Sequence, residues 1–218
     1  LGDLKHYPRT LEKDLEMLNK VLDEKDFVFT PSEKEMYPDQ IIEKHNYGDL
    51  EAVMEGAQRP GHFNGVSVVV SRLFKIIKPN KAYFGEKDFQ QLAIIKSLVK
   101  QQSFNIDIIP CEIIREPDGL AMSSRNARLA EDDRKYASII FKLLKLAKIR
   151  VLKGDTLAAI QKDLRNELNS IPNYTTEYVI FAREDTLEPI AKTAGQAVRC
   201  FIAVYAGEIR LIDNHPMY

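Results

Sequence analysis

Residues 85–88 read Gly-Glu-Lys-Asp (the GEKD segment) and directly follow a short apolar run that ends at the glycine. A glycine at a strand end lets a ligand approach the backbone closely, and the start of a following helix offers free N–H groups to an anion. Lys87 could add a mobile positive charge for a polyphosphate, and Asp88 could accept hydrogen bonds from ribose hydroxyls. A plain strand-to-helix turn, with Asp88 as the helix N-cap and Lys87 in solvent, explains the same residues.

Residues 122–125 read Met-Ser-Ser-Arg (the MSSR segment) and follow an Arg-Glu-Pro-Asp-Gly break at residues 115–119. Two hydroxyls and a guanidinium just after a turn can bind phosphate oxygens through charge-assisted hydrogen bonds. Alternatively, Ser123 or Ser124 caps a helix and Arg125 lies on the surface. If the break is a hinge, its closure would clamp a triphosphate between the GEKD and MSSR segments.

A third stretch, residues 59–65 (RPGHFNG), has the composition of a shaped loop that could line a pocket. His62 in this loop is more simply a hydrogen-bonded turn residue than a catalyst. The other histidines and both cysteines are scattered along the chain: His6, His45, His215, Cys111 and Cys200. Their spacing matches no zinc-binding pattern, and no Ser/His/Asp or Cys/His arrangement is recognisable.

Composition limits the classes of protein to consider. The 218 residues include 31 Lys and Arg against 32 Asp and Glu, a formal net charge of −1. A balance near zero argues against non-specific binding to nucleic acid or to acidic membranes. No apolar run approaches the roughly 20 residues that a membrane-spanning helix needs. With no secretory signal and no disulfide framework, we expect the protein to be located in the reducing cytoplasm.

The elements that must position these segments follow a strand–helix–strand order in the first half of the chain. The patterns predict a helix over 8–22, a buried strand at 27–31, a loop or single turn over 32–38, a buried helix over 63–77, a strand at 81–85, a helix over 88–102 and a strand over 104–114. The last three form a βαβ unit, which builds a parallel sheet with ligands at the carboxyl ends of its strands.

After residue 119 the pattern changes to one of helices followed by strands. It predicts amphipathic helices over 131–150 and 155–169 and strands at 175–182, 198–207 and 208–213. The last two strands are separated only by a Gly-centred turn. This α+β order predicts a second, smaller domain hinged near residues 115–119.

Several motifs occur together in one order: HYPRT, PSEKEMYP, EGAQRPGHFNGV, FGEKDFQQL and REPDGLAMSSRN. With the terminal RLIDN they make the chain resemble the pantoate–β-alanine ligase (pantothenate synthetase) family from about Leu4 to Asn214. The resemblance implies a homodimeric cytoplasmic enzyme with an α/β, Rossmann-like parallel sheet of the nucleotidyl-transferase type in residues 1–114. It also implies that residues 115–218 form an α+β lid domain.

The same resemblance implies an activity. Pantoate would attack the α-phosphate of Mg·ATP to give pantoyl adenylate and pyrophosphate, and β-alanine would then displace AMP to give pantothenate, a coenzyme A precursor. No covalent enzyme nucleophile is needed. Charge neutralisation and positioning must therefore supply most of the rate.

The site residues are also implied by the resemblance. Gln91 would contact pantoate, Tyr7 would lie over the pantoate pocket, and the backbone of Ile114 would meet adenine. Magnesium would be held mainly by ATP, without a metal site built by the protein. The ATP-binding residues would be Gly85, Glu86, Lys87, Asp88, Ile114, Met122, Ser123, Ser124 and Arg125. The catalytic ones among them would be Lys87, Ser123, Ser124 and Arg125.

The family's opening strand with an MGxLHxGH-type motif and its FVNPxQF segment are not in this sequence, which begins Leu1-Gly2-Asp3. We therefore expect a fragment that lacks the first strands of the sheet and part of the active site, and that turns over little or nothing. Two other hypotheses stay open. One is a related nucleotidyl transferase that stops at the nucleotide product, and the other is a nucleotide-binding or dimerisation module without activity.

Overall fold

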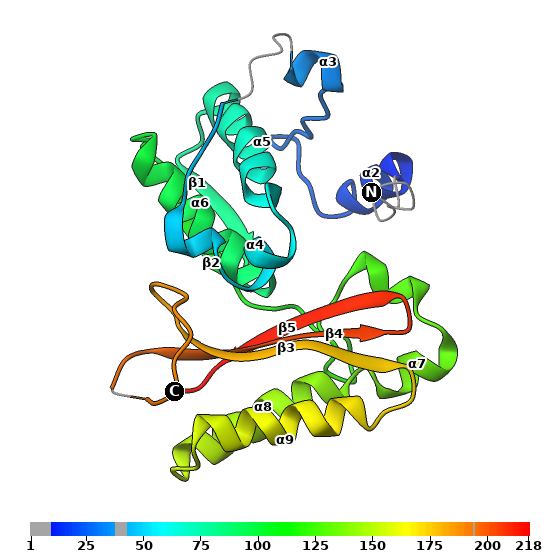
Figure 1. The fold of residues 1–218 in the computed structure, drawn as a ribbon. Helices are drawn as coiled ribbons and strands as arrows, with labels where there is room; N and C mark the ends of the chain where they lie inside the picture. The colour runs from blue at the N-terminus through cyan, green and yellow to red at the C-terminus, as the bar shows by residue number, and fades with distance from the viewer. Residues whose placement is uncertain (1–9, 38–42, 194) are drawn as a thin grey trace. The chain divides into compact units, whose positions relative to one another are not determined.

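The computed structural model (Figure 1) describes residues 10–37, 43–193 and 195–218. The chain divides into two units, residues 1–41 and residues 42–218. The first unit holds α2 (Leu11–Leu18), shorter than the predicted helix, and the single-turn helix α3 (Glu33–Met36). A capping box begins α3, since Ser32 accepts from the Glu35 N–H at 3.3 Å and the Glu35 carboxylate accepts from the Ser32 N–H at 2.8 Å. Of the two predictions for residues 32–38, a loop or a single turn, the turn is the one that the described residues 32–37 form.

The predicted buried strand at residues 27–31 is wrong. These residues form no strand, and Phe27 is 79% exposed. The run has the apolar and β-branched residues that strands favour, but a strand obtains its hydrogen bonds and burial from a neighbour. None of the strands in the described part of the chain pairs with residues 27–31.

The first half of the second unit carries the predicted βαβ order. It contains the 3₁₀ helix η1 (Gly48–Glu51), the helices α4 (Met54–Gln58) and α5 (His62–Ile77), the strand β1 (Lys81–Gly85), the 3₁₀ helix η2 (Glu86–Asp88), the helix α6 (Phe89–Gln101) and the strand β2 (Asp107–Cys111). β1 and β2 pair in parallel, from Lys81 opposite Asp107 to Gly85 opposite Cys111. The core between the helices and this sheet is filled by apolar side chains that include Phe63, Phe74, Ile94, Ile95 and Leu98.

The helix α5 is not buried all round as the sequence predicts. Phe63, Val68 and Phe74 on one face are buried, whereas Val69 and Ile77 are 40% and 44% exposed. The helix ends at Ile77, and the φ of +51° at the following Lys78 takes the chain out of helical geometry one residue before Pro79.

The second half of the unit has the predicted α+β order. It contains η3 (Ser124–Arg128), α7 (Glu131–Tyr136), α8 (Ile139–Leu152), α9 (Leu157–Asn169), β3 (Tyr174–Arg183), β4 (Val198–Ala206) and β5 (Ile209–Pro216). The three strands form an antiparallel sheet in the order β3-β4-β5, and Figure 1 shows α8 and α9 side by side along one face of it. Two differences from the prediction stand out: the helix over 131–150 is broken at residues 137–138, and β5 continues past residue 213 to Pro216.

None of the helices in the described parts of the chain is both long and apolar enough to cross a membrane.

Leu164 on α9 tests the core between α8, α9 and the sheet, where it is 1% exposed. We expect Leu164→Ala to lower the free energy of unfolding by about 3 kcal/mol, because it removes buried methyl groups and leaves a cavity. Denaturant titration measures this change. The control Leu152→Ala, at a leucine on α8 that is 62% exposed, should change it by no more than about 0.5 kcal/mol. A loss below about 1 kcal/mol for Leu164→Ala would contradict the packing described here.

Candidate active site

The GEKD segment lies where β1 ends, as the sequence predicts, and passes through η2 into α6. Gly85 itself is extended, and a Cβ added to it would meet nothing within 4 Å. The fold therefore does not require a glycine at this position, whereas a ligand approaching the backbone would benefit from one. Asp88 occupies the N-cap position of α6 but makes no capping hydrogen bond, so helix capping does not explain its carboxylate.

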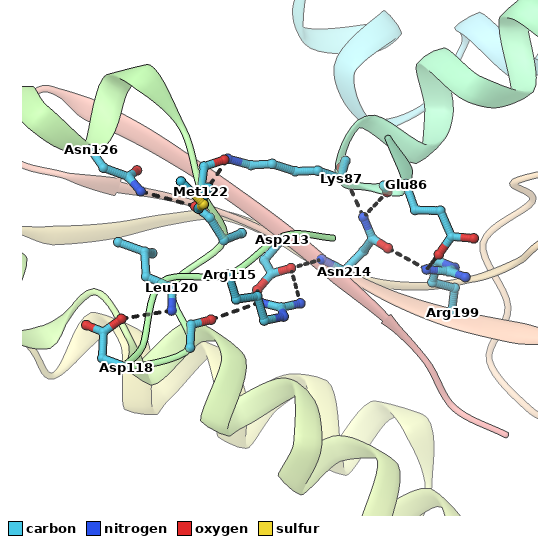
Figure 2. A network of polar contacts seen from close by, with 12 residues as sticks. Glu86, Lys87, Arg115, Asp118, Leu120, Met122, Asn126, Arg199, Asp213 and Asn214 are labelled. Carbon is cyan, nitrogen blue, oxygen red and sulfur yellow. Dashed lines mark hydrogen bonds and ion pairs between the residues drawn. The ribbon is translucent and has the colours of Figure 1, made fainter. Parts of the chain in front are cut away.

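The Lys87 side chain does not point into solvent. Its Nζ donates to the backbone carbonyl oxygen of Met122 at 2.9 Å and reaches that of Ala121 at 3.4 Å, as Figure 2 shows for Met122. Lys87 thus joins the GEKD segment to the beginning of the MSSR segment. Burial lowers the pKa of its amine, an effect that Asp88 and Asp213 partly oppose.

The Asp88 carboxylate stands beside Lys87 at the wall of a cavity. Nearby protein atoms partly desolvate this carboxyl and raise its pKa, an effect that outweighs the neighbouring ammonium although Asp88 as a residue is exposed. An ammonium and a carboxylate that are both partly desolvated at one cavity have the electrostatics of a ligand site.

In the MSSR segment, Ser123 caps the 3₁₀ helix η3, since its Oγ accepts a hydrogen bond from the Arg125 N–H at 3.2 Å. This confirms the capping interpretation for Ser123. It does not exclude phosphate binding, because a hydroxyl that accepts one hydrogen bond can still donate another. Ser124 is exposed and Arg125 is half-buried.

The break at residues 115–119 is a tight turn tied to two helices. Gly119 has a φ of +97°, and a Cβ there would come within 2.9 Å of the Phe141 ring on α8. Arg134 on α7 forms ion pairs with Glu116 at 2.6 Å and Asp118 at 2.5 Å. These contacts fix the position from which the MSSR segment begins.

The remaining predicted residues divide into three cases. Gln91 lines a cavity of about 50 Å³ together with Lys87 and Asp88, so the structure brings these three side chains together. Ile114 is 68% exposed, and its carbonyl oxygen accepts from the Met122 N–H at 2.9 Å. Tyr7 lies outside the described residues.

The loop at residues 59–65 lines the same cavity. Gly61, with φ +78°, precedes His62, the first residue of α5. The His62 backbone N–H donates to the Arg59 carbonyl at 3.0 Å, as expected for a turn residue. Burial above all, then the charge of Arg59, lowers the pKa of the His62 imidazole. Arg59 and His62 also line a second hollow, of about 460 Å³.

Sequence reasoning assigned no role to Asp213 and Asn214, which are 4% and 2% exposed near the end of β5. Asp213 forms a bidentate ion pair with Arg115, at 2.6 and 2.9 Å. Asn214 accepts from Arg199 Nη1 at 2.7 Å and donates to the backbone of the GEKD segment. The available signal was two adjacent polar residues directly after the apolar pair Leu211-Ile212, since buried polar side chains need partners.

Comparisons with known proteins extend these observations. A family model described as pantoate–β-alanine ligase matches residues 2–216. Pantothenate synthetases from Azobacteroides pseudotrichonymphae and Phocaeicola vulgatus are 49% and 47% identical over 216 residues, which is 98% of this chain and 76% and 75% of theirs.

Solved structures agree with the sequence matches. A crystal structure of pantothenate synthetase from Thermus thermophilus is 36% identical, with a TM-score of 0.90 over 98% of this chain and 76% of that one. A pantoate–β-alanine ligase from Francisella tularensis, in complex with an ATP ligand and β-alanine, is 35% identical with a TM-score of 0.78 over 99% and 73%.

The parallel sheet with its helices and the separate antiparallel sheet confirm the predicted α/β fold of the nucleotidyl-transferase type with a C-terminal α+β part. The chain spans about three quarters of the length of these relatives. The expectation of an inactive fragment finds no support in these matches. The chain belongs to the pantoate–β-alanine ligase family.

Proposed function

We propose that this chain is an ATP-dependent ligase that condenses pantoate with β-alanine to give pantothenate, AMP and pyrophosphate. The observation that carries the proposal is the hydrogen bond from Lys87 to the Met122 carbonyl oxygen. It brings together the two segments whose residues suit phosphate binding, and Lys87 also lines a cavity with Asp88 and Gln91. Family membership and the Francisella relative, whose structure holds an ATP ligand and β-alanine, support the same conclusion.

The proposed reaction has two steps. A pantoate carboxylate oxygen attacks the α-phosphorus of ATP, and pyrophosphate leaves as the new P–O bond forms. The β-alanine amine then attacks the acyl carbon, the bond to AMP breaks, and the amine loses a proton. A carboxylate is repelled by a polyanion, so positive groups must neutralise the phosphates during the first step.

Lys87, Arg125 and the hydroxyls of Ser123 and Ser124 are the proposed phosphate-binding groups. The carbonyl oxygens that now accept from Lys87 are neutral, so an anionic phosphate oxygen would be a stronger partner and could replace them. Gly85, Glu86 and Asp88 would complete the ATP site, with Met122 and the Ile114 backbone beside the base, and Gln91 would bind pantoate.

Magnesium would neutralise charge on the ATP phosphates, and the residues present fit a mainly ATP-held ion. Within the described ranges, no three His, Cys, Asp or Glu side chains are placed to hold a metal. Of the carboxylates that line the cavity, Glu55 and Asp213 already pair with arginines, which leaves Asp88 as the candidate protein ligand. Mg²⁺ is commonly held by one or two carboxylates together with phosphates and water.

We also propose the homodimer, the cytoplasmic location and the role of residues 115–218 as a lid over residues 1–114. These three proposals rest on the family resemblance. The test is limited proteolysis with and without a non-hydrolysable ATP analogue. A change in the rate of cleavage near residues 115–119 when the analogue is bound would support the lid.

The decisive experiment is ATP–pyrophosphate exchange with and without pantoate. Pantoate-dependent exchange, followed by β-alanine-dependent release of AMP and pantothenate, is the expected result. Exchange that requires no pantoate, or AMP release without pantothenate, would point to a different nucleotidyl transferase. Absence of exchange at saturating ATP, pantoate and magnesium would overturn the proposed function for this chain.

The lowered pKa of Lys87 predicts a pH dependence. Its ammonium should lose the proton at a lower pH than an exposed lysine, so kcat/KM for ATP in the exchange reaction should fall as the pH rises through this pKa. In Lys87→Arg the guanidinium stays charged, so this alkaline decline should disappear even if the overall rate is lower. An unchanged decline in Lys87→Arg would assign it to another group.

A further inference from the structure

Two neighbouring residues of β5 hold the two proposed phosphate-binding regions. Asp213 holds the turn that leads to the MSSR segment, because its carboxylate pairs with Arg115, which also donates to the Gly119 carbonyl at 3.0 Å. Asn214 holds the GEKD segment, because its Nδ2 donates to the carbonyl oxygens of Glu86 at 2.9 Å and Lys87 at 3.0 Å. Figure 2 shows the two contacts side by side.

The orientation of the Asn214 amide is fixed by its partners. Its Oδ1 accepts from Arg199 Nη1 at 2.7 Å, while both bonds of its Nδ2 go to carbonyl oxygens. An arginine can only donate and a carbonyl can only accept, so the flipped amide would lose all three bonds.

Arg199 is itself held on several sides. It is 4% exposed, its guanidinium carbon lies 4.0 Å from the centre of the Phe89 ring, and it pairs with Glu184 at 2.9 Å and Glu86 at 3.5 Å. The Asn214 amide is therefore a rigid donor that faces the backbone of the GEKD segment.

We propose that Asn214 is a positioning residue for the adenylation step, an inference that rests on the proposed function. Its two donated hydrogen bonds fix the peptide carbonyls of Glu86 and Lys87, and so set the direction in which the Lys87 and Asp88 side chains leave the backbone. Since Asp213 anchors the other segment, the spacing of the two phosphate-binding regions is set by adjacent residues of one strand. A displacement of about 1 Å at a reacting centre can cost on the order of 100-fold in rate.

The test uses Asn214→Asp, which keeps an oxygen for Arg199 and removes both donors. We expect kcat of pantoate-dependent ATP–pyrophosphate exchange to fall about 30- to 100-fold, with KM for pantoate within about twofold. The matched control is Asn169→Asp on α9. There Oδ1 accepts from the Thr176 N–H at 2.8 Å, so the same change keeps the bond and should leave kcat unchanged.

A second variant, Asn214→Leu, separates lost donors from added charge, because it removes the donors without adding a carboxylate. Similar losses of kcat in both variants, with thermal midpoints close to that of the wild type, support the proposal. A loss confined to Asn214→Asp would reveal a charge effect and overturn it. A loss of kcat that matches the unfolded fraction would reduce Asn214 to a stabilising residue and also overturn it.

Amide hydrogen exchange by mass spectrometry tests the positioning without activity. In Asn214→Asp and Asn214→Leu, peptides that cover residues 85–91 should exchange faster than in the wild type and in Asn169→Asp, while those from α9 should not. Unchanged exchange over residues 85–91 would overturn the proposal even if activity fell. The wild-type chain could show no pyrophosphate exchange while the two Asn214 variants still exchange amide hydrogens faster over residues 85–91. That result would refute the proposed function but would still show that Asn214 holds the GEKD segment.

Discussion

Lys87→Ala is expected to lower the rate of pantoate-dependent ATP–pyrophosphate exchange by about 100- to 1,000-fold at saturating substrates. The Lys87 ammonium is partly desolvated and reaches from the GEKD segment to the Met122 carbonyl oxygen, so its charge is held between the two proposed phosphate-binding segments. A preorganised positive charge in such a site is worth roughly 3–4 kcal/mol to a transition state that builds up negative charge. Initial rates of exchange, measured at several ATP concentrations, separate the loss in kcat from any change in KM.

The control is Lys96→Ala, which removes an exposed lysine on α6, the helix that follows the GEKD segment. It should leave the exchange rate within about twofold of the wild type, because a solvated charge contributes little. If Lys87→Ala were as active as this control, Lys87 would not bind the reacting phosphates. Supplying pantoyl adenylate provides a second control, since β-alanine-dependent AMP release should suffer much less than the first step.

The sequence predicted those parts of the fold that local patterns determine. Residues 81–114 were predicted to form a βαβ unit because a strand, a helix and a second strand follow one another with short joins, and β1, α6 and β2 confirm this order. The residues at 27–31 show the limit of the same reasoning. An apolar, β-branched run indicates a strand only where another strand is available to pair with it.

The contacts that organise the candidate site could not be predicted because they join residues far apart in the chain. Asn214 meets the GEKD backbone across more than a hundred residues, and no local pattern encodes that meeting. The contact depends on the length of β5, because the predicted strand, which ended at residue 213, would have placed Asn214 in a loop. By contrast, Lys87 and the MSSR segment could be predicted as candidates from the chemistry of their side chains, which is visible in the sequence.

Arg210→Met is expected to lower the free energy of unfolding by about 3–5 kcal/mol, the usual cost of removing one partner from a buried ion pair. Arg210 on β5 lies between Glu177 on β3, with Nε 3.0 Å from Oε2, and Glu55 on α4, with Nη1 2.9 Å from Oε2. Tyr178 also donates to Glu55, at 2.9 Å. Burial works against the charge of Arg210, but its bonds to the two carboxylates outweigh burial and raise its pKa.

The matched control is Arg150→Met, which also removes an arginine that bridges two carboxylates. The two arginine side chains are similarly buried, at 22% exposure for Arg150 and 19% for Arg210. Their partners differ: Asp155 and Asp163 are 41% and 55% exposed, whereas Glu55 and Glu177 are only 14% and 15% exposed. Left alone, the aspartates remain solvated, so Arg150→Met should cost no more than about 1 kcal/mol by denaturant titration.

A triple variant identifies the cause of the larger loss. If Arg210→Met destabilises because two carboxylates are left unpaired, adding Glu55→Gln and Glu177→Gln should recover most of the free energy, since neutral amides tolerate burial better than anions. No recovery would mean that the guanidinium acts through packing, for example against the Tyr178 ring, whose centre lies 6.0 Å away. Because Glu55 belongs to the short helix that leads into the Arg59–His62 turn, the same triple variant also shows whether this ion pair holds the cavity wall. A stable variant with a raised KM for pantoate would establish that role.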